Sequence, residues 1–363
     1  MATTTTQLHD HLRLIRSRGI GPVSYRQLIQ RFGSPGAAIE AIPDLARRGK
    51  GRAPQLASHD LVADEIERVE RQGAQYLVWG EPGYPALLAE LDDAPPVLTV
   101  KGKTDLLDKP AVAMVGARNA SAAAVRLARE LAADLGREGQ VIVSGLARGI
   151  DSAAHDGALW TGTIGVIAGG IDTVYPPENE ARQTDIAEEG LLVAEMPPGT
   201  QPTARHFPHR NRIIAGLAAG TLVVEAAPKS GSLITARLAA EAGREVMAIP
   251  GSPLDPRARG CNGLIRDGAT LVENAQDVLA SLGPIDMRMK GVAEDREPAP
   301  ILQADHDEHA SERVEALLGP VPVMVDELIR QSGLSAAEVQ LALLELDLAG
   351  RLDRHAGQKV SLR

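Results

Sequence analysis

The middle of the chain alternates short apolar runs with longer stretches that have helical periodicity. The apolar runs are typical of strands buried on both faces of a sheet, and they lie at 111–115, 141–144, 163–168, 191–195, 221–225 and 245–249. The helix-like stretches lie at 121–138, 152–160, 179–189, 211–219 and 233–242. This alternation predicts an α/β fold with a doubly wound, Rossmann-like parallel sheet. Extended segments near 76–79 and 97–101 are expected to lead into the sheet.

The N-terminal end has a helical pattern of its own. Residues 8–46 predict a helix, a turn at Gly19-Ile20-Gly21 and a second helix, and 47–75 continue as a polar helical stretch. The amides of such a hairpin can hold a DNA phosphate, or the glycines can simply make the turn of an αα-hairpin. The sequence leaves both interpretations open. We place a small helical domain at 1–75 and the sheet domain at 76–283, with its core at 105–283.

The C-terminal end predicts a winged helix over 313–363. Three helical patterns are followed by a hairpin pattern, and Ser335 with Glu338 forms a capping box at the start of the third helix. A recognition helix should carry basic or amide side chains toward DNA, but residues 335–349 contain no Lys or Arg. We therefore favour protein contact or a structural role over DNA binding. The preceding segment, 284–312, contains prolines and a net charge of −5, which is typical of a linker.

Composition narrows the class of protein. The chain has 363 residues, a formal net charge of −10 and one cysteine, Cys261. A single cysteine rules out a disulfide framework and fits a reducing cytosol, so we expect a cytoplasmic protein. The sequence shows neither a signal peptide nor an apolar run long enough for a membrane span. The net negative charge argues against a protein that coats nucleic acid with its whole surface, but it leaves room for a local basic pocket.

Arginines in glycine-containing loops predict such a pocket. Arg118 follows the first apolar run and Arg148 follows the second, while a third cluster spans residues 205–212. The loops at the carboxyl ends of parallel strands line one crevice, so these segments should meet there. Glycine-rich loops at 169–170 and 230–232 are expected at the same edge. Arginine forks and helix N-termini suit phosphate oxygens.

Other chemistries fit less well. A dinucleotide fingerprint needs glycine at 116, 118 and 121, but two of these positions are Arg118 and Ser121. The chain has no P-loop and no Cys/His cluster, so we expect no cofactor and no metal. Asp151 and His155 could share a helix face as a catalytic pair, but we favour a helix cap with His155 bonded nearby. A buried thiol is the simpler interpretation of Cys261, and Glu225 is expected to orient Arg210 or Arg118.

Several motifs in the sheet domain resemble the DNA-processing protein A (DprA/Smf) family. They are Val-Gly-Ala-Arg (115–118), Ser-Gly-Leu-Ala-Arg-Gly-Ile-Asp (144–151), Gly-Gly-Ile-Asp (169–172), Phe-Pro-x-Arg-Asn-Arg-Ile-Ile-Ala-Gly-Leu (207–217), Ser-Gly-Ser-Leu-Ile-Thr-Ala (230–236) and Gly-Cys-Asn-Gly-Leu-Ile (260–265). The match covers 105–283 in order. The flanks fit too, because family members often carry a helical SAM-like domain before the sheet and a winged helix after it. Ala117 departs from the serine that the family commonly has, and Cys261 departs from a small polar residue.

The resemblance implies a non-enzymatic protein that binds single-stranded DNA in natural transformation and recombination. Such a protein protects the incoming strand, helps to load the RecA recombinase and forms a homodimer through the sheet domain. Matching the motifs residue by residue implies phosphate or strand contacts from Arg118, Ser144, Gly145, Arg148, Gly149, Gly169, Gly170, Arg210, Asn211, Arg212, Ser230, Gly231 and Ser232. The glycines would let the strand approach the backbone, and Phe207 and Tyr175 are candidates for base stacking.

Two further expectations remain. Leu264, Ile265 and Leu271 lie in the last part of the sheet domain and are either core residues or a dimer surface.

The alternative function is a nucleotide-binding or phosphoribohydrolase-type enzyme on a similar sheet. Those enzymes pair an arginine with a Pro-Gly-Gly-x-Gly-Thr loop and a following Glu, which this chain lacks.

Overall fold

The structure, a computed structural model, describes residues 5–283, 309–355 and 357–363. The described residues fall into two compact units. Residues from Glu65 onward, up to 283, form one unit, and the N-terminal residues up to Asp64 form the other together with the C-terminal residues from His309 on. The acidic segment expected at 284–312 lies, up to residue 308, outside the described residues.

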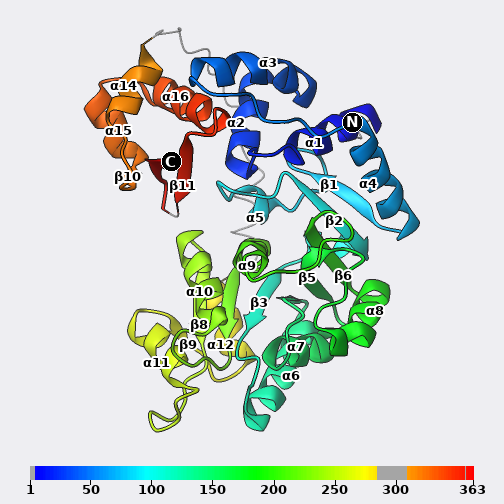
Figure 1. Ribbon diagram of the computed structural model, residues 1–363. Helices are drawn as coiled ribbons and strands as arrows, with labels where there is room; N and C mark the ends of the chain where they lie inside the picture. Colours follow the sequence, from blue (N-terminus) through cyan, green and yellow to red (C-terminus); the bar gives the residue numbers. More distant parts are fainter. Residues whose placement is uncertain (1–4, 284–308, 356) are drawn as a thin grey trace. The chain divides into compact units, whose positions relative to one another are not determined.

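The larger unit is built on a nine-stranded sheet in the order β1-β2-β6-β5-β4-β3-β7-β8-β9 (Figure 1). Its strands are β1 (Gln75–Val78), β2 (Val97–Gly102), β3 (Ala111–Val115), β4 (Val141–Ser144), β5 (Thr163–Gly170), β6 (Leu191–Met196), β7 (Gly220–Val223), β8 (Glu245–Ala248) and β9 (Thr270–Leu271). The seven strands β6-β5-β4-β3-β7-β8-β9, which are neighbours in this order, all pair in parallel. This pairing confirms the predicted fold. β2 joins β6 antiparallel, and β1 joins β2 antiparallel, so the two extended segments add an edge to the sheet.

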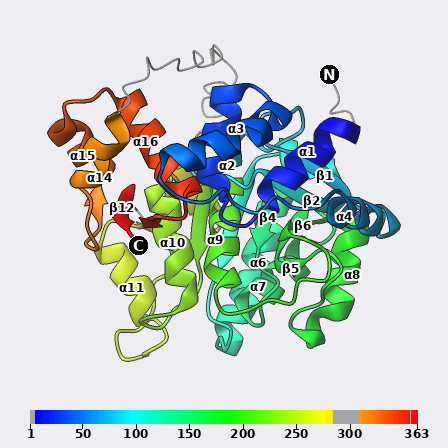
Figure 2. The same cartoon turned by 45° about the horizontal axis from the view of Figure 1, so that its top comes forward.

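Helices cover both faces of this sheet. One face carries α6 (Ala122–Arg137), α7 (Ile150–Ala158), α8 (Glu180–Glu189) and α12 (Ala275–Leu282), and the other carries α5 (Ala86–Ala89), α9 (His206–Leu217), α10 (Gly231–Glu241) and α11 (Arg259–Arg266). Neighbouring residues of β3 contribute to opposite cores, because successive strand side chains alternate between faces. α6 packs beside α7, and α9 packs beside α10 (Figure 2). Short 3-10 turns lie at Thr104–Asp108 and Pro177–Asn179.

One helix boundary differs from its prediction in a way that matters for the site. We expected a helix from residue 211, but α9 begins at His206. Pro208 lies in the first turn of α9, where a missing amide costs no intrahelical hydrogen bond. Arg210 and Arg212 therefore lie within α9 and not at its start.

The smaller unit combines N-terminal helices with a winged helix. The first part has α1 (Thr5–Ile15), α2 (Pro22–Phe32) and α3 (Pro35–Arg48), and α4 (His59–Arg71) begins in this unit. The second part has α14 (Ala310–Ala316), β10 (Val323–Met324), α15 (Val325–Ser332), α16 (Ala336–Leu348), β11 (Leu352–His355) and β12 (Lys359–Leu362). The capping box of Ser335 and Glu338 is present at the start of α16. The three helices and the hairpin of the winged helix are thus confirmed. None of the described helices has the length and apolar character needed to cross a membrane.

Candidate nucleic-acid interface

A pocket of about 240 Å³ lies over the carboxyl ends of β3, β4 and β5. Its walls come from the loops that follow these strands and from the first turns of α9. The lining residues are Arg118, Gly145, Leu146, Ala147, Arg148, Ile167, Ala168, Tyr175, Pro176, Pro177, Glu178, Phe207 and Arg210. The structure therefore brings together the three arginine-bearing segments that the sequence placed at one edge of the sheet.

Arg118 is an exposed cation of this pocket. Its Cζ atom lies 5.1 Å from the centroid of the Phe207 ring, which is within the range of a cation–π interaction. The Phe207 ring in turn lies 5.5 Å from the ring of Tyr175, measured between centroids. No carboxylate of the described chain forms an ion pair with Arg118. Its charge is thus available to an anion that enters the pocket.

Arg148 also lines the pocket and is exposed. Its Nη1 atom lies 3.6 Å from a carboxylate oxygen of Glu178, in a pair whose side chains are both more than half exposed. An exposed pair of this kind contributes little to stability. Glu178 is a pocket residue that sequence analysis missed. The only sequence feature that could have indicated Glu178 is its place after Tyr175, Pro176 and Pro177.

Arg210 is buried beneath the pocket, with 6 % of its surface exposed. It donates hydrogen bonds to the carbonyl oxygens of Gly145 and Val166. Burial lowers the pKa of Arg210 to about 10, an effect that Asp151 opposes and Arg118 reinforces. The guanidinium is therefore charged at neutral pH and joins the loop after β4 to strand β5.

Arg212 and Asn211 do not line the pocket. Arg212 is buried and donates hydrogen bonds to a Glu195 carboxylate oxygen at 2.6 Å and to the Asp93 carbonyl oxygen at 2.6 Å. Its charge is compensated inside the fold, so we omit Arg212 from the proposed phosphate contacts. Asn211 accepts a hydrogen bond from Arg210 Nε at 3.3 Å.

The glycines of the pocket loops allow close packing within the protein. A Cβ atom at Gly145 would come within 2.6 Å of Arg210 Nη1, and one at Gly149, where φ is +77°, would overlap the carbonyl oxygen of Ala117. Cβ atoms at Gly169 and Gly170 would lie 2.6 Å from the Thr200 carbonyl oxygen and 2.5 Å from that of Pro197. Packing within the protein therefore explains why these positions are glycine. Strand contact at their backbone stays a prediction.

The expected serines are engaged elsewhere. Ser144 is fully buried and donates a hydrogen bond to the carbonyl oxygen of Met114 at 2.7 Å. The hydroxyls of Ser230 and Ser232 lie 2.8 Å apart and bond to each other, while Gly231 is exposed at the start of α10. None of these residues lines the pocket. A phosphate at the start of α10 would therefore be a separate contact, and it stays a prediction.

The candidate catalytic groups are held within the fold. Asp151 accepts hydrogen bonds from the backbone amides of Gly145 and Ala147, and burial raises the pKa of its carboxyl against the opposing effect of Arg210. His155 bonds the Thr163 hydroxyl at 2.7 Å, and burial lowers its pKa to about 3. The Cys261 thiol is buried, which confirms the expectation, and this burial raises its pKa to about 11.

Glu225 does not orient an arginine, and that expectation is wrong. Its carboxylate accepts hydrogen bonds from the backbone amide of Ser121 at 3.0 Å and from the Ser121 hydroxyl at 2.7 Å. The carboxylate therefore stabilises the start of α6, where the amides carry a partial positive charge.

The residues proposed for a dimer surface are divided between core and surface. Leu264 and Ile265 pack partly buried against the core of the larger unit, whereas Leu271 is 47 % exposed. Leu271 lies in β9 at the edge of the sheet. Only Leu271 of the three is therefore available to a partner, and the dimer stays a prediction.

Comparison with known families decides which family the chain belongs to. Residues 75–283, which include the whole pocket, match the family model described as DNA recombination-mediator protein A. The chain belongs to this family. Two further DprA models match the flanks: the DprA-like N-terminal HHH domain at residues 5–67 and the DprA winged helix domain at 296–358. The family membership suggested by the motifs is thus confirmed.

Relatives within the DprA family include full-length and partial matches. Protein Smf of a Synechocystis species is 32 % identical, over 95 % of this chain and 96 % of the relative. DNA processing protein DprA of Streptococcus pneumoniae is 51 % identical, over 54 % of this chain and 70 % of the relative. The match to the second protein is confined to about half of the chain.

Two solved DprA structures are similar to this one. The X-ray structure of DprA from Streptococcus pneumoniae matches with a TM-score of 0.65 and 35 % identity, and the match covers 78 % of this chain and 100 % of that one. A structure of DprA from Helicobacter pylori, described as giving insight into a unique single-stranded DNA binding mode, matches with a TM-score of 0.52 and 31 % identity. That match covers 60 % of this chain and 97 % of the other.

Proposed function

We propose that the chain is a single-stranded DNA-binding mediator of recombination, and that the pocket over β3, β4 and β5 holds the strand. The observation that carries this proposal is the position of Arg118: it is exposed, lies over the Phe207 ring and has no described carboxylate as an ion-pair partner. A guanidinium next to aromatic rings fits a phosphate and its neighbouring base at once. The Helicobacter pylori relative, which is described as binding single-stranded DNA, supports the same ligand.

The size of the pocket favours a single strand over a duplex. Its volume of about 240 Å³ accommodates a base or a phosphate, and three loops and a helix form its walls. A duplex presents its bases stacked inside, so it cannot place a base on Phe207 or Tyr175 without being opened. Binding should therefore depend on the backbone and on stacking, with little sequence preference.

The finer parts of the role rest on family membership. We propose that the protein protects incoming single strands during natural transformation, assists the loading of RecA and acts as a cytoplasmic homodimer. The exposed Leu271 at the sheet edge supports a dimer surface on the larger unit.

We further propose that the protein acts by binding and not by catalysis. Asp151 is bonded to loop amides, His155 to Thr163, and the Cys261 thiol is buried. None of these side chains lines the pocket. The alternative, a phosphoribohydrolase-type enzyme, requires a base or nucleophile next to a bound nucleotide. The pocket offers only Glu178, which is exposed and paired with Arg148.

The test compares a fluorescent oligo-dT with a duplex of the same length in one buffer. The proposal predicts tighter binding of the single strand, and equal or tighter binding of the duplex would contradict it. A hydrolysis assay with nucleoside monophosphates is run on the same preparation. Release of free base above the buffer background would favour the enzyme alternative.

A further inference from the structure

The third helix of the winged helix, α16, is apolar on more than one side. Val339, Ala342, Leu343 and Leu346 belong to the core of the winged helix. A second set, Leu341, Leu344 and Leu348, is also buried but lies outside that core. A helix that is apolar all round is normally covered on all sides. Here α3 and α2 of the N-terminal domain pack against α16 and cover its second side.

Two glycines allow the backbones to approach closely at this contact. A Cβ atom at Gly49 would overlap the carbonyl oxygen of Glu345, and a Cβ atom at Gly51 would overlap that of Ala349. Gly49 has φ −70°, a conformation open to any residue. Its lack of a side chain therefore matters for the fit against α16 and not for the local backbone.

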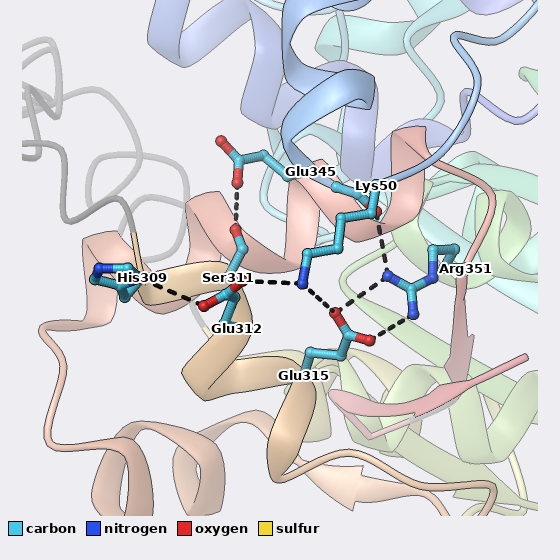
Figure 3. A network of polar contacts seen from close by, with 8 residues as sticks. Lys50, His309, Ser311, Glu312, Glu315, Glu345 and Arg351 are labelled. Atoms are coloured by element: carbon cyan, nitrogen blue, oxygen red, sulfur yellow. Dashed lines mark hydrogen bonds and ion pairs between the residues drawn. The ribbon is translucent and has the colours of Figure 1, made fainter.

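Charged groups close the rim of the contact, as Figure 3 shows. Lys50 Nζ lies 3.1 Å from a carboxylate oxygen of Glu312 and 3.9 Å from one of Glu315. Arg351 donates hydrogen bonds to Glu315 at 2.5 Å and to the Gly49 carbonyl oxygen at 3.4 Å. The segment after α3 is thus held by both α14 and the residue before β11.

The interior of the contact carries specific polar bonds. Ser24 donates a hydrogen bond to Asp347 at 2.6 Å, and Gln27 donates one to Gln340 at 2.6 Å. Arg354 bonds Asp347 at 3.0 Å and Gln27 at 3.3 Å, so it joins both pairs. These groups are at least half-buried, so their pairing fixes one register between the two domains.

The same contact leaves α16 unfit to bind DNA. A recognition helix presents exposed side chains to the major groove, but after Ala336 no side chain of this fully described helix is exposed. The polar groups that α16 does carry include the carboxylates of Glu338, Glu345 and Asp347 and no cation. These carboxylates would repel phosphates even if the helix were uncovered.

We propose that the winged helix of this chain is a protein-docking module whose partner is the N-terminal domain of the same chain, and that α16 does not bind DNA. The α16 interface, defined as α16 with Gly49, Lys50 and Gly51, joins the two ends of the chain into one unit. This inference does not depend on the pocket of the larger unit. The two proposals can therefore fail separately.

Zero-length cross-linking of the full chain tests the docking directly. A carbodiimide joins a lysine amine to a carboxylate only when the two touch, and the expected product links the Lys50 peptide to the peptide that carries Glu312 or Glu315. Lys103 and Glu189, which lie 2.7 Å apart in the larger unit and are both exposed, provide the control for the reaction. A sample that mixes 15N-labelled and unlabelled chains distinguishes links within one chain from links between copies. Absence of the Lys50 link while the control link forms, or Lys50 links only between copies, would overturn the proposal.

A matched pair of glycine variants separates docking from folding. Gly49→Ala places a methyl group against the α16 backbone, whereas a Cβ atom at Gly319 in the winged helix meets open space. We expect Gly49→Ala to reduce the Lys50 link at least severalfold, while Gly319→Ala leaves it unchanged and both variants keep the Lys103 link. Parent-level Lys50 linking in Gly49→Ala would contradict the interface. Tighter duplex binding by Gly49→Ala than by the parent would show that α16 binds DNA when uncovered.

Discussion

The guanidinium of Arg118 lies 5.1 Å from the ring centroid of Phe207, and the two residues come from different elements, the loop after β3 and the first turn of α9. The contact holds an exposed charge at a fixed place above a ring that is itself only partly buried. A base that stacks on Phe207 would therefore bring its phosphate toward Arg118.

Replacing Phe207 with leucine should weaken oligo-dT binding, because the stacking surface for a base is lost while apolar volume is kept. The expected loss is about 1 kcal/mol, roughly fivefold in affinity, as for a single base–aromatic contact. Tyr175→Phe serves as the control because it retains the neighbouring ring, and its affinity should equal that of the parent. The measurement is fluorescence anisotropy with both variants checked by circular dichroism. Unchanged binding by Phe207→Leu would exclude stacking at this residue.

Replacing Glu178 with glutamine should strengthen binding. The change removes a negative charge from the pocket and frees Arg148, which lies 3.6 Å from that carboxylate. We expect a gain of about two- to fivefold at low salt, the equivalent of one exposed ion pair. The gain should shrink as salt screens the charges. Glu180→Gln removes an equal charge from an exposed position at the start of α8 and should have no effect. Weaker binding by Glu178→Gln than by Glu180→Gln would contradict the proposed site.

The buried imidazole of His155 makes stability depend on pH. Its pKa is about 3 in the folded protein, against an ordinary value of 6.5 for an exposed histidine, so the unfolded chain binds the proton more readily. The stability that depends on neutral His155 is present above pH 6.5 and is lost as pH falls toward 3. Between about pH 7 and pH 5 this effect should lower the free energy of unfolding by about 2 kcal/mol.

Urea unfolding at about pH 7 and pH 5 measures this effect by comparing the parent with His155→Gln. The glutamine side chain does not titrate, so the variant should lose about 2 kcal/mol less than the parent over this interval. Equal losses in both proteins would mean that His155 is protonated in the folded state.

A charge at the sheet edge should separate the expected dimer. Leu271 is 47 % exposed in β9, and an aspartate there would be buried without a partner in a symmetric interface. Light scattering should show a dimeric parent and a folded, monomeric Leu271→Asp. Trp160→Asp, which changes a residue that is 80 % exposed near the end of α7, should remain dimeric. A monomeric parent would remove the dimer hypothesis.

The sequence predicts the sheet well because its strands are continuous apolar runs between helix-like stretches. β3 and β4 have the predicted bounds, since Gly116 and Gly145 end both runs. The antiparallel addition of β1 and β2 could not be predicted, because the pairing of β2 with β6 joins segments far apart in the chain.

The sequence predicts that the arginine-bearing segments meet in one pocket, but it does not predict the role of each residue there. Arg118 and Arg148 lie in loops, where side chains face outward, and both are exposed as expected. Arg210 and Arg212, in contrast, are buried. The sequence did not indicate this, because α9 begins earlier than the periodicity suggested and the hydrogen-bond partners of both arginines come from distant segments. Pro208 was the available signal, since proline is favoured in the first turn of a helix.

The measurement that tests the central claim most directly is the salt dependence of oligo-dT binding by the parent, Arg118→Ala and Arg118→Lys. Arg237→Ala is the control, because Arg237 is an exposed arginine that pairs with Glu241 and does not line the pocket. We predict that Arg118→Ala binds more weakly and that its slope of log K against log salt is smaller in magnitude by about 0.7, the value for one phosphate contact on a single strand. Arg118→Lys should keep the slope of the parent and regain only part of the affinity, because lysine lacks the bidentate fork. An Arg118→Ala protein with the affinity and slope of the parent would contradict the assignment of the pocket as the DNA site.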